Sequence, residues 1–308
     1  MTALPQSETD TPTRAGFVAL IGAPNAGKST LINRLVGTKV AIVSHKVQTT
    51  RSTIRGILMA GQSQIIFVDT PGIFRPKRRL DRAMVDTAWG GAKDADVVAL
   101  LIDAAVGLTD DVKELIGKLK EIGQPKVLLL NKIDMVKRES LLEITAQANA
   151  LLPFERTFMV SALSGDGLED FVAHIAERVP AGPWLYPEDE VSDVPLRQLA
   201  AEITREKLFE RLHQELPYHA TVETEEWKEQ KDGSVRVAQT IFVERESQKK
   251  IVIGAGGAVI KAISMAARKE IGAIAETPVH LFLFVKVREN WADDPERYRA
   301  MGIEFPKG

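Results

Sequence analysis

The first indication of chemistry in this sequence is a set of glycines placed close to one lysine and one serine. They form an uninterrupted run: Gly22-Ala23-Pro24-Asn25-Ala26-Gly27-Lys28-Ser29. Glycines let successive backbone N–H groups turn toward one anion, and a helix expected to begin at Thr30 adds the positive end of its dipole. Lys28 would reach the outer phosphates, and the Ser29 hydroxyl is a ligand for magnesium. The run, together with Thr30, predicts a nucleoside triphosphate site and leaves the base open.

A second set of polar residues indicates which base is bound. Asn131, Lys132 and Asp134 follow the predicted strand Lys126–Leu130, at the carboxyl edge of the sheet where such folds bind ligands. The Asp134 carboxylate can accept both the ring N–H and the exocyclic amine of guanine, whereas adenine lacks this donor pair, so an ATP-dependent kinase is disfavoured. Asn131 and the stem of Lys132 would brace the loop and the ring. A backbone N–H of the run Ser161-Ala162-Leu163 would meet the guanine carbonyl, and the combination predicts GTP.

Two further segments are expected to respond to the γ-phosphate. In the run Asp69-Thr70-Pro71-Gly72, the carboxylate would hold magnesium through water and the last N–H would contact the γ-phosphate. In the run Gln48-Thr49-Thr50-Arg51, Thr50 would complete the magnesium shell, with Thr49 as the alternative. Loops tied to the γ-phosphate order with it and relax on hydrolysis. The residues expected to act in catalysis are Lys28, Thr50 and Gly72, and those expected to bind magnesium are Ser29, Thr50 and Asp69.

The elements that must position these residues alternate between strand and helix patterns in the first half of the chain. Near-continuous apolar runs predict the buried strands of a mostly parallel sheet: Phe17–Ile21, Ile65–Val68, Val97–Ile102, Lys126–Leu130 and Thr157–Val160. Apolar residues at helical spacing predict helices that cover both faces of this sheet: Asp111–Glu121, Arg138–Leu151 and Leu168–Arg178. A hairpin around Gly61 would pair Arg55–Ala60 with Gln64–Val68 at the sheet edge.

Composition and patterning divide the chain into a tail, a linker and two domains. Residues 1–13 are polar and acidic and are expected to be disordered, and residues 14–180 form an α/β nucleotide-binding domain. Residues 181–195, rich in proline and acidic residues, are interpreted as a linker to an α+β domain at residues 196–308. The second domain is expected to contain helices at Leu196–Leu216 and up to Ile271, and extended segments at Tyr218–Gln230, Ser234–Glu244, Ile251–Ile253 and Val279–Val287.

A glycine loop in the second domain is a candidate contact for nucleic acid. Gly254-Ala255-Gly256-Gly257 has the Gly-x-x-Gly pattern with which some domains clamp about four single-stranded nucleotides. The pattern alone is weak, and the pair Ala255-Gly256 lacks the basic residue that is common between the two glycines. Because the second domain is not basic as a whole, RNA affinity would depend on nearby cations: Lys249, Lys250, Lys261 and Arg268.

Composition excludes several other classes of protein. The 308 residues carry a formal net charge of −2, which argues against a basic nucleic-acid coat. The chain has no cysteine, so a disulfide scaffold, a cysteine nucleophile and a thiolate metal site are excluded. The longest apolar runs are far shorter than the ~20 residues of a membrane span. The first residues lack the features of a signal peptide, and a cytoplasmic protein is expected.

The motifs taken together resemble those of small translation-factor-like GTPases. The forms Gly-x-Pro-Asn-x-Gly-Lys-Ser, Gln-Thr-Thr-Arg and Asp-Thr-Pro-Gly are similar to the bacterial Era family, whose members carry a C-terminal RNA-binding KH domain after a linker. The resemblance implies GTP, GDP and Mg²⁺ as ligands. For Asn25 it leaves two roles open: holding a potassium ion beside the phosphates, or only capping or bracing the loop. It also implies slow hydrolysis, because Ile73, which we count with the nucleotide-binding residues, replaces the water-orienting glutamine of Ras-type enzymes.

The same resemblance implies the partners of the protein. They are the single-stranded 3′ end of the 16S rRNA and the 30S particle, and the process is assembly of the small ribosomal subunit. A monomer in the cytoplasm is expected, with peripheral contact at the inner membrane left open. An alternative of another class is a GTP-regulated protein- or membrane-interaction module without specific RNA binding.

Overall fold

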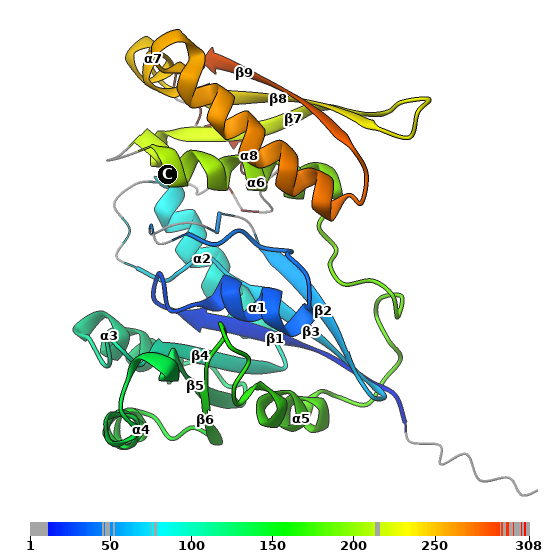
Figure 1. Ribbon diagram of the computed structural model, residues 1–308. Helices are drawn as coiled ribbons and strands as arrows, with labels where there is room; N and C mark the ends of the chain where they lie inside the picture. The colour runs from blue at the N-terminus through cyan, green and yellow to red at the C-terminus, as the bar shows by residue number, and fades with distance from the viewer. Residues whose placement is uncertain are drawn as a thin grey trace, which may run out of the picture.

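The computed structural model describes residues 12–44, 46, 50–51, 53–74, 76, 79–212, 216–289, 291, 294–295, 298, 303 and 305. These residues form two domains, one above the other in Figure 1, with the segment 181–195 running between them along one side. The alternative metal ligand Thr49 and residues 1–11 of the predicted tail at residues 1–13 lie outside the described residues.

The first domain is built on a six-stranded sheet with the order β2-β3-β1-β4-β5-β6. Neighbouring strands are parallel except β2 and β3, which form the predicted antiparallel hairpin at the edge. The central strands are almost continuously buried, as expected for a parallel sheet covered on both faces. The strand bounds are β1 (Arg14–Gly22), β2 (Ile54–Ala60), β3 (Ser63–Asp69), β4 (Val97–Asp103), β5 (Lys126–Asn131) and β6 (Arg156–Val160).

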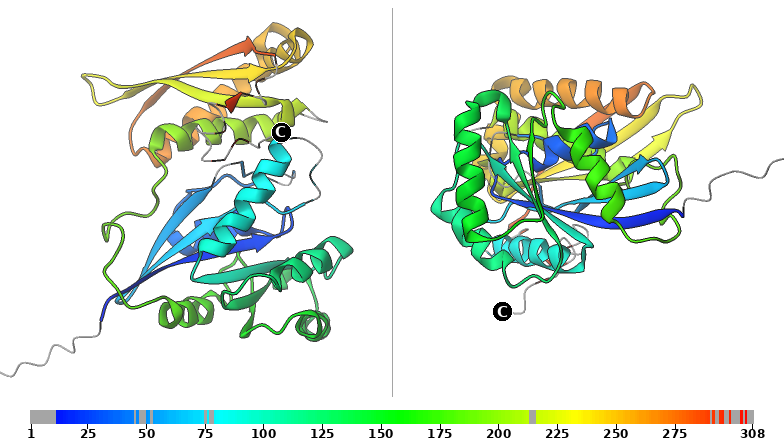
Figure 2. Two further views of the ribbon diagram at one scale, coloured as in Figure 1. Left: turned by 180° about the vertical axis from the view of Figure 1, so that it is seen from behind. Right: turned by 90° about the horizontal axis from the view of Figure 1, so that it is seen from below.

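Helices cover both faces of this sheet (Figure 2). They are α1 (Lys28–Val36), α2 (Arg79–Asp94), α3 (Asp110–Leu119), α4 (Arg138–Leu151) and α5 (Leu168–Arg178). Helices α1 and α5 pack on one face of the sheet, and α2, α3 and α4 pack on the other. Helices α4 and α5 have the predicted bounds. Helix α2 was not predicted, although its buried residues Ala83, Met84, Ala88 and Ala92 recur at helical spacing.

The segment interpreted as a linker is attached to the first domain rather than free of it. Thr13 and Gly182 exchange hydrogen bonds between the two ends of the domain. Ser192 forms a β-bridge with Gly56 of β2, and Arg55 pairs with Asp193 at 2.6 Å. The segment therefore follows the edge strand before the chain enters the second domain.

The second domain packs helices against one face of a three-stranded sheet with the order β7-β8-β9. Its core lies between this face and the helices. Strands β7 and β8 are joined by the predicted tight turn, where Gly233 has a φ of 81°. The bounds are α6 (Leu196–Arg211), β7 (Ala220–Glu229), β8 (Val235–Val243), α7 (Glu246–Ile253), α8 (Ala258–Ile274) and β9 (Val279–Val287).

Two predictions in this domain were wrong. Ile251–Ile253, predicted as a strand, is the last turn of α7, which begins where the Gln248 side chain accepts the backbone N–H of Arg245. Val252 is buried while Ile251 is 56% exposed, so the apolar run presents one face of a helix to the core. The helix predicted over Leu196–Leu216 ends at Arg211, because Leu212 is already extended.

Candidate functional site

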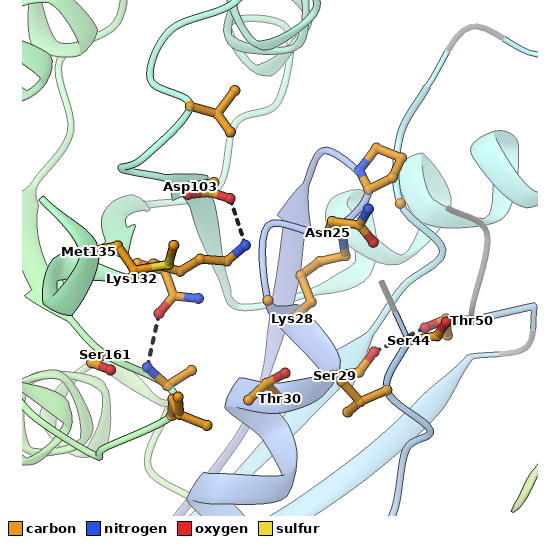
Figure 3. A pocket seen from close by; sticks show the side chains of 18 of the residues that line it. Asn25, Lys28, Ser29, Thr30, Ser44, Thr50, Asp103, Lys132, Met135 and Ser161 are labelled. Carbon is orange, nitrogen blue, oxygen red and sulfur yellow. Dashed lines mark hydrogen bonds and ion pairs between the residues drawn. The ribbon is translucent and has the colours of Figure 1, made fainter. Parts of the chain in front are cut away.

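A cavity of about 620 Å³ opens at the carboxyl ends of the first domain's strands (Figure 3). The glycine-rich run, the loop after β5 and the loop after β6 meet there, as predicted. The predicted site residues that line it are Pro24, Asn25, Gly27, Lys28, Ser29, Thr30, Thr50, Gly72, Asn131, Lys132, Asp134, Ser161, Ala162 and Leu163.

The buried side chain of Asn131 joins three loops around this cavity. Its Nδ2 donates to the carbonyl of Ala26 at 2.8 Å, and its Oδ1 accepts the backbone N–H of Ala162 at 2.9 Å. Gly27 has a φ of +100°, and a Cβ there would lie 2.2 Å from Asn131 Nδ2. Only glycine therefore permits this close approach, and Asn131 braces the loop as predicted.

Lys28 is buried at the centre of the glycine-rich run. Its Nζ donates to the carbonyls of Gly22 at 3.0 Å and Ala23 at 3.1 Å. Burial lowers the pKa of Lys28 to about 8, although the charge of Asp69 opposes the shift. A phosphate would add negative charge beside this buried ammonium and stabilise its charged form, which favours an anionic ligand beside the loop.

Three oxygen-bearing side chains meet beside Lys28 and fit a magnesium ion. Ser29 Oγ donates to Asp69 Oδ2 at 2.8 Å and lies 3.1 Å from Thr50 Oγ1, which is 3.3 Å from the same carboxylate oxygen. Asp69 Oδ1 is buried and has no hydrogen-bond partner among the described residues. Burial raises the pKa of Asp69, so a cation here would be stabilising. Carboxylate and hydroxyl oxygens are hard donors of the type magnesium prefers.

The other end of the cavity is suited to a planar ring. The exposed Asp134 is one of the residues that line the cavity. Lys132 also lines it, and the Nζ of Lys132 lies 2.6 Å from Asp103 Oδ2 (Figure 3). Exposed apolar side chains line the same end of the cavity: Val106, Met135 and Leu163. A base would therefore meet a carboxylate at one edge and apolar groups on its faces.

Some predicted nucleotide-site residues do not line the cavity. Thr70 Oγ1 donates to the Leu20 carbonyl at 2.8 Å. Ile73 is 8% exposed and packs in the core against α2, while its N–H donates to the Gly22 carbonyl at 3.1 Å. Thr70 and Ile73 therefore contact the backbone of β1 outside the cavity lining and help to hold the glycine-rich run in place. The predicted residues outside the lining are Gly22, Ala23, Ala26, Asp69, Thr70, Pro71 and Ile73.

The cavity also contains residues that sequence reasoning missed. Asp103 follows the buried strand β4 at the carboxyl edge, and this position could have identified it. The residues from the segment before Thr50 gave no local signal, since short apolar runs are common in loops. The missed lining residues are Ile42, Val43, Ser44, Asp103, Val106 and Met135.

The glycine loop of the second domain connects α7 to α8. Gly254, Gly256 and Gly257 have φ values of 75°, 57° and 80°, which favour glycine. A Cβ on Gly254 would lie 2.5 Å from Cγ2 of Val259. At Gly256 and Gly257 an added Cβ would meet no heavy atom of the described residues within 4 Å, apart from their chain neighbours. The loop is thus shaped by Gly254 and open at the other two glycines.

The predicted cations lie on the two helices beside this loop. Lys249 and Lys250 are on α7, and Lys261 and Arg268 are on α8. Lys250, Lys261 and Arg268 are exposed, and Lys249 lies 3.9 Å from Glu246. The surface around the loop can therefore present positive charge although the domain as a whole is not basic. In the described part of the chain, no single helix could cross a membrane; α7 and α8, bent by 42°, reach the required length and composition only as a pair.

The fold and both sites define a P-loop GTPase joined to a KH domain. Residues 17–132 match the family described as 50S ribosome-binding GTPase, and residues 215–292 match the KH domain. The chain belongs to the GTPase Era family. It is 69% identical over 296 residues to the GTPase Era of Rhizobium meliloti (strain 1021), which covers 96% of this chain and 95% of that protein. It is 66% identical to the GTPase Era of Brucella suis biovar 1 (strain 1330), with the same coverage of both chains.

Two solved structures of Era proteins have the same fold. Both have a TM-score of 0.89 and 38% identity, and the match covers 94% of this chain and 99% of each of them. One is a variant of Aquifex aeolicus Era bound to GDP.AlF4-, and the other is Era in complex with MgGDPNP and nucleotides 1506-1542 of 16S ribosomal RNA. The family resemblance and the fold class read from the motifs are therefore confirmed, and the protein is a GTPase that hydrolyses GTP.

Proposed function

We propose that this protein is a GTP-operated switch whose KH domain binds the 3′ end of 16S rRNA during small-subunit assembly. One observation supports this proposal above all: the same chain contains both a cavity suited to a nucleotide and an open Gly-x-x-Gly loop. One end of the cavity is suited to phosphate and the other to a base. The RNA in the second Era structure, nucleotides 1506-1542 of 16S ribosomal RNA, supports the choice of RNA.

In this proposal, the triphosphate lies along the glycine-rich run and the guanine lies at Asp134. Lys28 contacts the outer phosphates, and Gly72 presents its N–H to the γ-phosphate. Ser29, Thr50 and Asp69 hold magnesium, which neutralises charge that develops on the phosphates. The MgGDPNP and GDP.AlF4- ligands of the two Era structures support the nucleotide and metal assignments.

We also propose that Asn25 holds a potassium ion beside the phosphates. Asn25 lines the cavity next to Lys28 (Figure 3), and its φ of 62° places it in the left-handed region at the turn of the run. A side-chain amide oxygen is a suitable ligand for such a cation. Replacement of potassium by sodium should slow hydrolysis in the parent protein and have no effect on Asn25→Ala.

The protein is further proposed to act as a cytoplasmic monomer that engages the 30S particle through Gly254–Gly257 and the cations beside it. Peripheral contact with the inner membrane is a secondary proposal, supported by the exposed apolar side chains of Ile251 on α7 and Met265 on α8. The alternative without specific RNA binding is disfavoured by the match to the KH family over residues 215–292.

The central experiment measures RNA binding in defined nucleotide states. The full-length protein is mixed with a labelled RNA from the 3′ end of 16S rRNA, or with a scrambled RNA of equal length, in GDP or in a non-hydrolysable GTP analogue. We expect the ribosomal RNA to bind more tightly than the scrambled RNA, and the nucleotide to change its affinity. Equal affinity for both RNAs would favour the interaction-module alternative.

A further inference from the structure

The segment between α1 and β2 belongs to the nucleotide cavity and is also held by the second domain. We call residues 39–51 the Thr50 segment. Ile42, Val43, Ser44 and Thr50 from this segment line the cavity. Its described residues also contact the second domain at Lys39, Val43, Lys46 and Arg51. The segment that carries Thr50 is therefore held by a domain that contributes no described residue to the lining of the cavity.

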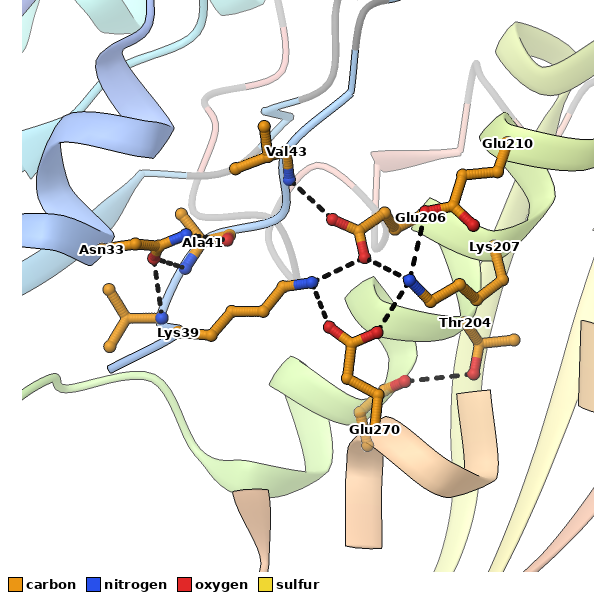
Figure 4. A network of polar contacts seen from close by, with 11 residues as sticks. Asn33, Lys39, Ala41, Val43, Thr204, Glu206, Lys207, Glu210 and Glu270 are labelled. Carbon is orange, nitrogen blue, oxygen red and sulfur yellow. Dashed lines mark hydrogen bonds and ion pairs between the residues drawn. The ribbon is translucent and has the colours of Figure 1, made fainter. Parts of the chain in front are cut away.

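Glu206 of α6 forms the first attachment (Figure 4). Its Oε1 accepts the backbone N–H of Val43 at 2.8 Å, and its Oε2 lies 2.6 Å from Lys39 Nζ and 2.9 Å from Lys207 Nζ. The Glu206 side chain is only 4% exposed. A carboxylate buried to this extent needs these partners to offset the cost of its desolvation. The contact with Val43 therefore belongs to a buried interface between the domains and is not a solvent-exposed ion pair.

Arg51 forms the attachment nearest to Thr50. It is 4% exposed, and its guanidinium donates to the backbone carbonyls of Ala220 at 2.9 Å, Tyr218 at 3.1 Å and Pro217 at 3.3 Å. It also lies over the rings of Phe209 and Trp291. Backbone carbonyls do not titrate or rotate away, so Arg51 sits in a fixed socket formed by the second domain.

Lys46 strengthens the same arrangement. Its Nζ donates to the carbonyls of Phe209 and Leu212, at the end of α6. Cations are favoured at a helix C-terminus, where carbonyls lack partners within the helix. Attachments thus lie on both sides of the part of the segment that enters the cavity.

We propose that the second domain positions Thr50, with Arg51 and Glu206 as positioning residues of the GTPase site. This inference rests on the proposed role of Thr50 as a magnesium ligand. The same interface would couple the KH domain to the nucleotide site, because Glu270 of α8 pairs with both Lys39 and Lys207. Helix α8 begins directly after Gly254–Gly257, so one rigid helix connects the RNA loop to the Thr50 segment. Binding linkage is reciprocal, so magnesium–GTP and RNA should affect each other through this interface.

A role in domain packing alone makes a different prediction from a positioning role. If the attachments only held the domains together, their loss would lower stability and leave the relative affinities for the GTP analogue and GDP unchanged. If the attachments position Thr50, their loss should lower the affinity for the GTP analogue and leave the affinity for GDP unchanged. The reason is that Thr50 is expected to bind the metal only when the γ-phosphate is present.

The first test titrates magnesium against binding of a fluorescent non-hydrolysable GTP analogue and of fluorescent GDP. In Arg51→Ala we expect the magnesium concentration for half-maximal analogue binding to rise about tenfold, the loss typical of one hydrogen bond to a charged group. GDP affinity should change less than about twofold, within the scatter of such measurements. Arg51→Lys, which keeps the charge and part of the hydrogen bonding, should restore a portion of the effect.

Arg55→Ala is the matched control, because Arg55 pairs with Asp193 of the linker and not with the second domain's core. It should behave as the parent. Because Arg51 is buried and its removal could unfold the chain, Glu206→Ala and Glu206→Gln form a second series. The glutamine amide oxygen can still accept the Val43 N–H, so Glu206→Gln should be milder than Glu206→Ala. Glu210→Ala is the control here, since Glu210 contacts Lys207 and is half exposed.

Thr50→Ala separates failure of this inference from failure of the proposed metal site. If Thr50→Ala raises the magnesium requirement but Arg51→Ala and Glu206→Ala, both folded by circular dichroism, do not, the positioning role is wrong and the metal assignment stands. If Thr50→Ala itself has no effect, both are wrong. The same variants should also reduce the ratio of RNA affinities in the analogue and GDP states, a change that loss of stability alone would not produce.

Discussion

The nucleotide cavity and the glycine loop of the KH domain are both proposed to contact phosphate, yet they are built in opposite ways. Lys28 and Asn131 in the cavity lining, and Asp69 beside it, are buried and held by several contacts each. In the loop, Gly256 and Gly257 have open space where a side chain would be. A compact, highly charged ligand needs groups held at set positions, whereas a flexible strand needs an accessible backbone and nearby positive charge. The function of the cavity therefore depends on individual buried side chains, whereas that of the loop depends mainly on the absence of side chains at Gly256 and Gly257.

The largest expected effect removes the cation at the centre of the cavity. Lys28→Ala should abolish measurable hydrolysis and weaken triphosphate binding, because loss of one preorganised donor typically costs about 10²- to 10³-fold in rate. Single-turnover hydrolysis and nucleotide titration measure it. RNA binding without nucleotide should persist, and Lys113→Ala, an exposed lysine on α3, is the control. Retained turnover in the pure variant would show that the glycine-rich run is misassigned.

The base-binding end should show a smaller and more selective effect. Asp134→Asn replaces an acceptor by an amide that presents a donor to guanine, so GTP affinity should fall by about 2–5 kcal/mol, as for other truncated charge-assisted pairs. Xanthosine triphosphate, with the complementary pattern, should gain affinity. Competition binding with both nucleotides checks the prediction, and unchanged GTP affinity would remove Asp134 from the base site.

The glycine loop should respond to added bulk and charge without affecting the cavity. Replacing both Gly256 and Gly257 by Asp should weaken RNA binding at least about tenfold, because like charges brought together cost several kcal/mol. The positive φ values add a backbone cost of about 1–2 kcal/mol per residue. Gly233→Asp is the control, since Gly233 has a φ of +81° and open space but lies in the β7–β8 turn.

Basal GTP hydrolysis should survive in the double loop variant. The loop prediction is contradicted if the folded double variant binds ribosomal RNA as tightly as the parent does at the same salt concentration. In that event the Gly-x-x-Gly loop would be a structural turn, and the contrast between the two phosphate sites would disappear.

The smallest effect concerns the ion pairs that connect the two regions. Burial tends to raise the pKa of Glu270, but hydrogen bonds from Lys207 and Lys39 hold it below its ordinary value. A lowered native pKa contributes stability above the unfolded value of about 4.3, and this contribution is lost as the pH falls through the native pKa. Such a partly exposed pair contributes no more than about 1 kcal/mol.

The parent should therefore be more stable than Glu270→Gln near pH 6, and the difference should shrink as the pH falls below about 4.3 and through the lowered native pKa of Glu270. Urea unfolding of both proteins across this range measures the effect. Glu229→Gln, at an exposed end of β7, should show no such pH-dependent difference. A constant gap between parent and Glu270→Gln at every pH would mean that the side chain acts through packing and not through its charge.

Much of the fold and the cavity could be predicted because the signals are local. The buried strands of the first domain are continuous apolar runs, and the site motifs lie directly after β1, β3, β5 and β6. The misses have physical reasons. Three apolar residues ending at Ile253 are too few to distinguish a strand from the last turn of a helix. Helix α2 follows a charged run, and its small buried alanines give a weak apolar pattern.

By itself, the sequence predicted the chemistry of the nucleotide site and placed glycines at positions 27 and 254, while the close contacts that require glycine there came from the structure. The residues predicted to contact phosphate and base lie in short contiguous runs, and parallel strands bring their ends to one edge of the sheet. Only the tertiary structure decided that Arg51 is buried in the second domain, that Asp103 holds Lys132, and that Lys39 meets Glu206, 167 residues away along the chain. These contacts depend on how two separately patterned domains pack, and no local spacing records which distant partner satisfies a buried charge.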